Sequence, residues 1–433
     1  MEKIKGKITK DNIFMIYVIS IALSVLTITL IRAATTAITW DEAYTYVEYS
    51  RNFNINQFIN IHSNFANNHI LNTIFIAILD TLCNLPYNEF IIRLPNIIML
   101  VFYFIGSYMV SKTKKHKYLV FTGLVLNYYV IEYFGLGRGY GISTAFVVFM
   151  CYFFEKAHKN DYDDKNIFIS AIFGMLACYA NTVSILALFT IAIIYLVQII
   201  KKKDLVDFLK RNIMKLIPLV ILLVYIVIFH FIVTGSDKPV FGEEYGNTIT
   251  GFMKKSFVWM FVENEAINMI VTSIGIVFIA ISTYIHKKKL KNSPFFIALL
   301  VMIVVLIVPS LILKKPFLIE RCLNPLWPIF VLGMMEIYTL WTETIKNKAK
   351  EIVISAVIIL ALIFAFVIRI DTTSTRNWAN NYEIKEIMYR ALVENRSLTE
   401  EEYVENKDYF GMTFYQNKIF EKYGVDVLRE NIK

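Results

Sequence analysis

Two adjacent carboxylates, Asp41 and Glu42, come a few residues after the first apolar run of the chain. If this stretch is helical, Asp41, Thr45 and Glu48 share one face and aromatic side chains occupy the neighbouring one. Aromatic rings favour the headgroup level of a membrane, so we expect a helix along the surface with its acids toward water. A carboxylate at that depth can act on a substrate carried by a lipid. The alternative is a juxtamembrane turn whose acids are only solvated.

Other polar side chains fall on the same side of the membrane in the topology derived below. An acid at the edge of a span is more often functional than one on an ordinary surface, which favours a role for Glu132. The full set is His69 with Asn67 and Asn68, Arg93, Glu132, Arg138 and Tyr140 in a glycine-rich turn, Glu243 with Glu244, and Glu320 with Arg321.

Most of these residues also have a purely structural explanation. Arg138 and Arg321 could snorkel to the interface, His69 could cap a helix, and the acids at 243–244 could belong to a solvated loop. The glycines of 135–141 lack the lysine and the strand of a phosphate-binding loop. We therefore expect these glycines to form a tight turn between two spans.

The chain as a whole is strongly apolar. Of its 433 residues, 57% are hydrophobic, and the mean hydropathy is +0.53. These values exclude an ordinary soluble protein and predict many membrane spans. The formal charge of +9 does not indicate nucleic-acid binding, because the basic residues form short clusters between apolar runs, as in cytoplasmic loops. The four cysteines show neither metal-binding spacing nor a disulfide framework.

The N-terminus carries lysines ahead of the run 13–31 and no convincing cleavage site, which predicts a retained first span and a cytoplasmic N-terminus. Segment 69–85 is apolar but includes Asp80, which is costly inside a span, so we predict a surface helix. Segment 167–180 is short for a crossing of roughly 17–25 residues and predicts a tilted helix or one broken around Asn181. The predicted spans are 13–31, 94–110, 118–134, 140–154, 167–180, 183–200, 213–233, 266–285, 295–313, 323–340 and 352–368.

The loop charges support this assignment. It places five lysine-rich clusters in the cytoplasm, whereas a crossing at 69–85 would put them outside, against the positive-inside rule. These clusters lie at 112–117, 156–165, 201–215, 287–291 and 346–350.

The predicted fold class is an all-α polytopic membrane protein. It has about eleven transmembrane helices, amphipathic surface helices in the first external loop and a small extracytoplasmic C-terminal region. Residues 1–370 form the transmembrane unit, with the first external loop at 34–92. Residues 371–433 form a charged, helix-compatible tail outside the membrane.

Five short motifs in this order resemble those of the C-type membrane glycosyltransferases, within them the family of protein O-mannosyltransferases and aminoarabinose transferases. The resemblance covers roughly residues 13–340. The two prolines that this family often has after its histidine are Ile70 and Leu71 here, and a tyrosine expected after Arg321 is Cys322. The motifs are Trp40-Asp41-Glu42-Ala43-Tyr44, Asn68-His69-Ile70-Leu71, Arg93-Leu94-Pro95, Arg138-Gly139-Tyr140 and Glu320-Arg321-Cys322-Leu323-Asn324-Pro325.

This resemblance implies a sugar donor attached to a polyprenyl phosphate and an inverting transfer to a hydroxyl at the outer face of the cell membrane. Asp41, supported by Glu42, would take the acceptor proton. Arg138 and Arg321 would neutralise the departing phosphate. The resemblance and the polar inventory make substrate-binding candidates of His69, Tyr140, Glu132, Arg93 and Glu320.

Some members of this family hold a divalent ion, which Asp41, Glu132 and His69 could ligate, but nothing in the sequence requires a metal. The competing hypothesis is a transporter or lipid flippase. Transporters tend to carry ionisable residues near mid-span and to show repeated halves, whereas in this chain mid-span charges are scarce and no repeat is visible. The sequence leaves open which sugar moves and whether the acceptor is a protein, a lipid, teichoic acid or another glycan.

Overall fold

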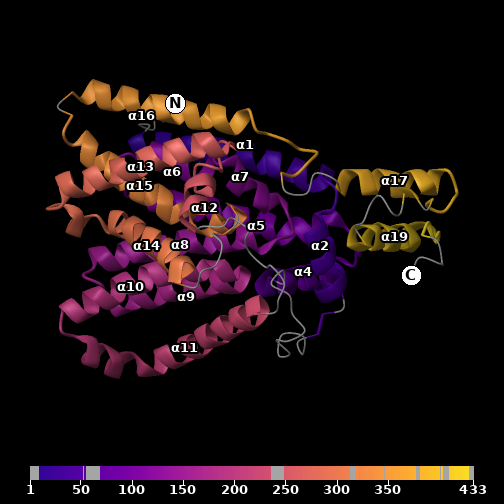
Figure 1. The fold of residues 1–433 in the computed structure, drawn as a ribbon, viewed down its shortest axis with the longest axis horizontal. Helices are drawn as coiled ribbons and strands as arrows, with labels where there is room; N and C mark the ends of the chain where they lie inside the picture. The colour runs from indigo at the N-terminus through magenta and orange to yellow at the C-terminus, as the bar shows by residue number, and fades with distance from the viewer. Residues whose placement is uncertain are drawn as a thin grey trace, which may run out of the picture.

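The protein is helical throughout the part that the computed structural model describes (Figure 1). That part comprises residues 9–51, 53–54, 69–235, 248–312, 318, 320–345, 347–376, 381–399, 401–402 and 409–428. The elements in chain order are α1 (Lys10–Thr35), α2 (Trp40–Thr45), η1 (Tyr46–Ser50), α4 (Ile70–Cys83), α5 (Glu89–Ser111), α6 (Lys117–Val125), α7 (Tyr128–Glu132), η3 (Tyr133–Gly135), α8 (Gly139–Lys159), α9 (Asp164–Ala180), η4 (Thr182–Ser184), α10 (Ile185–Lys201), α11 (Leu205–Gly235), α12 (Thr248–Lys255), α13 (Glu265–His286), η5 (Leu290–Asn292), α14 (Pro294–Ile312), η6 (Glu320–Leu326), α15 (Trp327–Thr342), α16 (Lys348–Val367), α17 (Asn381–Val393) and α19 (Tyr409–Tyr423).

Several helices have the length and composition of membrane spans. Ile352, Leu360 and Phe364 of α16 are each more than 60% exposed, which suits a surface that faces lipid. The chain is therefore a helical membrane protein, and the eleven crossings remain a prediction. Among the described residues, the six helices that are long and apolar enough are Asp11–Thr35, Glu89–Ser111, Thr182–Lys201, Leu205–Ile228, Glu265–His286 and Lys348–Val367.

The span predicted at 118–134 is wrong as a continuous helix, because the structure breaks it into α6 and α7. A break leaves carbonyl groups without helical donors, which is costly inside a membrane. Two side chains from other elements replace those donors. The Tyr103 hydroxyl donates to the Leu124 carbonyl at 2.5 Å, and the Trp327 indole N–H donates to the same carbonyl at 3.2 Å. Long-range partners therefore make this break possible.

Two further interruptions lie near the same end of the bundle. The Asn181 side chain accepts a hydrogen bond from the Val183 N–H at 3.0 Å, between α9 and α10, as the short segment at 167–180 suggested. The second is the glycine-rich turn between η3 and α8, where the segments Tyr128–Gly135 and Gly139–Lys159 meet at 119°. This sharp bend brings the N-terminus of α8 toward α2.

Helix α4 occupies the segment for which we predicted a surface position. Its 14 residues are fewer than the roughly 17 that a crossing needs. Asp80 on this helix is buried, and it accepts hydrogen bonds from the Tyr46 hydroxyl at 2.8 Å and from Arg51 at 3.3 Å. The acid therefore faces the first loop, which favours the surface position over a crossing.

The tail helices α17 and α19 pack against the first loop. They share a buried apolar cluster with residues of α2, η1 and α4. The Tyr415 hydroxyl accepts a hydrogen bond from the Ile38 N–H at 2.9 Å, and the rings of Tyr44 and Phe410 meet edge to face at 4.6 Å. Figure 1 shows both tail helices beside α2 and α4, at one end of the molecule. The described part of the tail therefore lies on the same side as Asp41.

We predict that this common side is extracytoplasmic. In a cysteine-free background, Ser397→Cys on the tail should react with a membrane-impermeant maleimide on intact cells, because Ser397 is exposed. Lys112→Cys, exposed after α5 at the predicted cytoplasmic end, is the matched control and should react only after lysis. The reverse pattern would invert the predicted orientation.

Candidate functional site

Helix α2 presents the two adjacent carboxylates on different sides. Thr39 begins the helix with a capping box: its hydroxyl accepts from the Glu42 N–H at 3.2 Å, and Glu42 Oε2 accepts from the Thr39 N–H at 2.8 Å. This reciprocal cap fixes the start of a helix of only six residues. The cap turns the side chain of Glu42, the third residue of the helix, toward the protein interior. The side chain of Asp41, one residue earlier, therefore points in a different direction.

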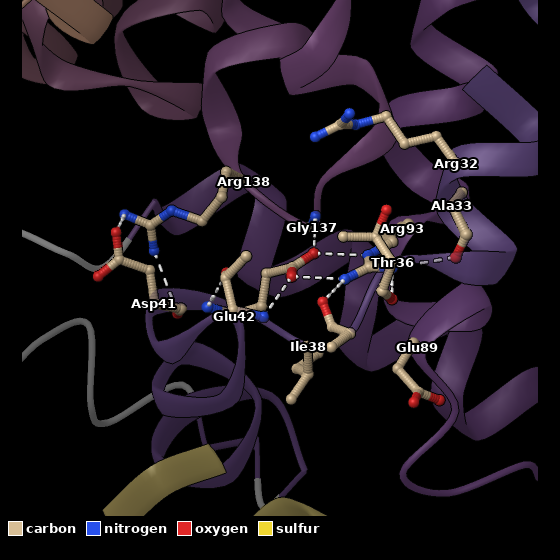
Figure 2. A network of polar contacts seen from close by, with 12 residues as sticks. Arg32, Ala33, Thr36, Ile38, Asp41, Glu42, Glu89, Arg93, Gly137 and Arg138 are labelled. Carbon is tan, nitrogen blue, oxygen red and sulfur yellow. Dashed lines mark hydrogen bonds and ion pairs between the residues drawn. The ribbon is translucent and has the colours of Figure 1, made fainter. Parts of the chain in front are cut away.

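Glu42 forms a fully buried clamp with Arg93 (Figure 2). The guanidinium binds the carboxylate with two parallel hydrogen bonds of 2.8 Å, from Nε to Oε1 and from Nη2 to Oε2. The Gly137 N–H adds a third donor at 2.5 Å, and the Thr39 N–H adds the fourth. A carboxylate accepts about four hydrogen bonds, so Glu42 has no capacity left.

Arg93 is equally saturated. Its remaining N–H groups donate to the carbonyls of Ala33 at 3.0 Å, Thr36 at 2.7 Å and Ala37 at 2.8 Å, at the end of α1. Burial opposes ionisation of Glu42, but the guanidinium and the backbone donors outweigh it and hold the pKa of Glu42 below its usual value. The pair therefore joins α1, α2, α5 and the glycine-rich turn, and its role is structural.

Asp41 has different surroundings. Its carboxylate pairs with Arg138 at 3.4 Å, and the same guanidinium donates to the Asp41 carbonyl at 3.2 Å (Figure 2). This guanidinium also donates to the Thr45 hydroxyl at 3.2 Å. Asp41 and Thr45 therefore share a face, as predicted, whereas Glu48, predicted on the same face, is exposed in the π-helix η1. The prediction that both acids face water is wrong, since Asp41 is 6% exposed and Glu42 is fully buried. The turn before α8 covers α2 and excludes solvent.

The glycine-rich turn can pack closely against α5 and the end of α9 because it lacks side chains at two crowded positions. A Cβ atom at Gly139 would lie 1.8 Å from the Ala180 carbonyl oxygen, and one at Gly137 would lie 2.6 Å from the Ile92 side chain. These contacts exclude any larger residue without a backbone shift. The glycines of 135–141 thus form the tight turn that we expected, and this turn positions Arg138.

His69 and Tyr140 lie beside this pair. Both are buried, and their rings meet edge to face with centroids 5.1 Å apart. The His69 ring bonds the Ala180 carbonyl. Burial, and then the charges of Arg138 and Arg321, hold the pKa of His69 well below its usual range. The imidazole is therefore neutral at physiological pH.

Arg321, from η6, completes the group. The Arg321 guanidinium interacts electrostatically with Tyr140 and with the Asp41 carboxylate. The neighbouring Cys322 is fully buried against Tyr140, and burial raises the pKa of its thiol to about 12, so it is an uncharged packing residue. The structure therefore brings together Asp41, His69, Arg138, Tyr140 and Arg321, five of the predicted site residues, from four separate segments.

Glu132 belongs to a different cluster. Its carboxylate pairs with Arg32 of α1 at 2.6 Å and accepts a hydrogen bond from the Arg376 N–H at 3.1 Å. Arg32 also donates to the Tyr128 hydroxyl at 2.6 Å and to the carbonyl of Asp371. In Figure 2, Arg32 lies apart from both the Asp41 and the Glu42 pairs. This network ties α1 and α7 to the segment after α16.

Arg32 was not among the functional residues predicted from the sequence. The signal was available, because an acid at a span edge needs a nearby counter-charge. Asn324 was noted in the sequence only as part of the motif at 320–325. Asn324 is fully buried, and neither atom of its side-chain amide has a hydrogen-bond partner among the described residues. It follows Arg321 by one helical turn and is a further candidate for contact with a ligand.

The metal site considered from the sequence is not assembled. Within the described ranges, no three histidine, cysteine, aspartate or glutamate side chains lie together as a metal would require. Glu132 is paired with Arg32, and His69 stands in the field of two guanidinium groups, which would repel a cation. The residues present therefore do not fit a divalent ion.

Other predicted residues have clear positions. Arg93 serves the clamp, and Glu320 is partly buried at the start of η6. The predicted residues Asn67, Asn68, Glu243 and Glu244 lie outside the described residues.

A cavity of about 550 Å³ lies at the opposite end of the bundle from Asp41. It is lined by the ends of α5, α8 and α15, where Lys114 pairs with Glu155 at 3.1 Å and with Glu336 at 3.5 Å. Both lysine and glutamate side chains line it, and the lysines belong to clusters that we predict to be cytoplasmic. Its ion pairs join helix ends, and it shares no residue with the group around Asp41.

Comparison of the chain with protein-family models, with curated proteins and with solved structures finds no match.

Proposed function

We propose that this protein is a membrane glycosyltransferase. It moves a hexosyl or pentosyl group from a polyprenyl-phosphate-linked donor to an acceptor hydroxyl at the extracytoplasmic face, with inversion at the anomeric carbon. The proposal includes eleven crossings and a C-terminal tail on the outer side. It rests on the sequence resemblance together with the geometry around Asp41.

The difference between the two adjacent acids is the observation that carries this proposal. Glu42 is saturated by four donors and cannot take a proton without breaking the clamp. Asp41 lies among Arg138, Arg321 and a neutral His69. One carboxylate beside two guanidinium groups matches the needs of base-assisted attack on a glycosyl phosphate.

The chemical step follows from these roles. Asp41 takes the proton of the acceptor hydroxyl while the hydroxyl oxygen bonds to the anomeric carbon of the sugar. The bond between that carbon and the phosphate oxygen breaks, and polyprenyl phosphate leaves with the electron pair. Arg138 and Arg321 stabilise the charge that grows on the phosphate. No step requires a metal.

A transfer assay tests the proposal. The purified protein in lipid nanodiscs is supplied with radiolabelled undecaprenyl-phosphate-linked glucose, mannose or aminoarabinose. The acceptor is an envelope extract from a strain in which the gene for this protein is deleted, so that its acceptor sites are unmodified. Label should move from at least one donor into the extract. Passage of the donor across proteoliposomes without any transfer would favour the transporter or lipid flippase, and no reaction with any donor would overturn the proposal.

Arg138→Lys and Arg321→Lys are each predicted to weaken donor binding about tenfold or more, because lysine keeps the charge but loses the guanidinium fork. The Michaelis constant for the donor measures this effect. Arg51→Lys is the control, since Arg51 is half-exposed and pairs with Asp80. A donor constant unchanged from wild type in either Arg138 or Arg321 variant would remove that arginine from the site.

A further inference from the structure

His69 has one hydrogen-bonding atom that the fold does not use. The residue is 5% exposed, and its ring bonds the Ala180 carbonyl. Its other ring nitrogen, Nε2, is buried and has no hydrogen-bond partner in the described part of the chain. Buried polar atoms are nearly always paired in native proteins, so an unpaired one beside a candidate site indicates a ligand contact.

The bond to Ala180 determines what Nε2 can do. A carbonyl only accepts, so the ring nitrogen bonded to it must carry the proton. The ring is neutral, because burial and two nearby guanidinium charges oppose a second proton. Nε2 is therefore a lone-pair acceptor, held in a fixed direction, and it needs a donor such as a hydroxyl group.

The position of this acceptor selects one hydroxyl, and this step rests on the proposed function. The charges of Arg138 and Arg321 influence the His69 imidazole, and these two arginines are the groups proposed to hold the donor phosphate. In a glycosyl phosphate the phosphate is attached to the anomeric carbon. The sugar hydroxyl nearest to it is on C2, and the ring oxygen on the other side has no proton to donate.

We propose that His69 Nε2 accepts a hydrogen bond from the C2 hydroxyl of the donor sugar and makes the enzyme selective for sugars that carry it. Hydrogen bonds to this hydroxyl strengthen in glycosyl-transfer transition states, because positive charge develops at the adjacent carbon. His69 is then a contact for substrate, in addition to its bond to Ala180.

Two substitutions of His69 distinguish the role of the nitrogen bonded to Ala180 from the role of Nε2. In His69→Asn, the amide N–H can still reach the Ala180 carbonyl, but nothing remains at the position of Nε2. In His69→Gln, the longer side chain can place its amide oxygen near that position, at the expense of the Ala180 bond. A purely structural His69 would be replaced better by Asn, and an acceptor of the C2 hydroxyl better by Gln.

The measurement is kcat/KM for the donor that the wild type uses in the transfer assay and for its synthetic 2-deoxy counterpart. The preference for the hydroxylated donor over the 2-deoxy donor should be about tenfold or more greater in the wild type than in His69→Asn. His69→Asn should lose this preference while eluting as a folded protein, and His69→Gln should keep part of it. Comparing ratios between variants cancels the intrinsic reactivity of the 2-deoxy sugar.

The following results would contradict the proposed role of His69. An equal ratio of kcat/KM for the two donors in the wild type and in His69→Asn would overturn the role of His69 and leave the transferase intact. If His69→Asn does not fold, loss of the preference in His69→Gln to the level of a His69→Phe variant would also overturn it. A wild type that transfers no sugar from any donor would overturn the proposed function and this inference together.

Discussion

Asp41→Asn is expected to lower the rate of sugar transfer about 10²–10⁴-fold, the usual contribution of a general base. Asparagine is nearly isosteric with aspartate but cannot accept the proton of the acceptor hydroxyl. The substitution leaves Arg138 and Arg321 in place, so donor binding should persist. Single-turnover transfer and donor binding, measured on the same preparation, separate the two effects.

Glu48→Gln is the matched control for this prediction. Glu48 lies in η1, directly after α2, and it is exposed, so its variant should retain wild-type turnover. Near-normal turnover in Asp41→Asn, combined with a collapse in a folded Glu42→Gln protein, would show that the other carboxylate is the base. Collapse in Glu48→Gln would indicate an effect on the helix and not on proton transfer.

Arg93→Met is expected to destabilise the folded protein by about 3–5 kcal/mol, because it leaves the Glu42 carboxylate buried without its counter-charge. It also removes the donors from the three carbonyls at the end of α1. The readout is the temperature at which the detergent-solubilised protein loses its monodisperse elution peak. Lys289→Met, which breaks a half-exposed pair with Glu343, should cost at most about 1 kcal/mol. Equal effects of the two substitutions would contradict the clamp.

The Glu42–Arg93 clamp also makes the stability of the folded protein depend on pH, in a predictable direction. The pKa of Glu42 is lower in the folded protein than its ordinary value of 4.5, so the pair stabilises the folded state above that value. This contribution is lost as the pH falls below 4.5 and through the folded pKa. The wild type should therefore lose more stability than Glu42→Gln between pH 5 and about pH 3. Parallel loss in both proteins would show that Glu42 does not carry this dependence.

The fold class and most helix positions could be predicted from the sequence, because apolar length and loop charge are local properties. Long apolar runs give helices where every backbone group can be satisfied within the segment. The runs at 94–110 and 266–285 correspond to α5 and α13 within a few residues. Asp80 is a further example, because the cost of a buried acid placed α4 outside the set of spans before any contact was known.

The internal breaks depend on partners far away in the chain. Nothing in residues 118–134 shows that the helix stops before Asn127. The interruption is tolerated because Tyr103 and Trp327 supply hydrogen-bond donors from other elements. A local pattern records which residues are apolar, but it does not record which side chains will satisfy an opened backbone.

The roles of the acids were also decided by the tertiary structure. The sequence alone placed Asp41 with Thr45 on one face, because helical geometry relates residues four apart. It could not show that Glu42 would be saturated by Arg93 and Gly137, 51 and 95 residues further along the chain. Nor could it show that Glu132 would pair with Arg32 instead of joining Asp41. Ion pairs between distant segments form only where packing excludes water and leaves each charge one partner within reach.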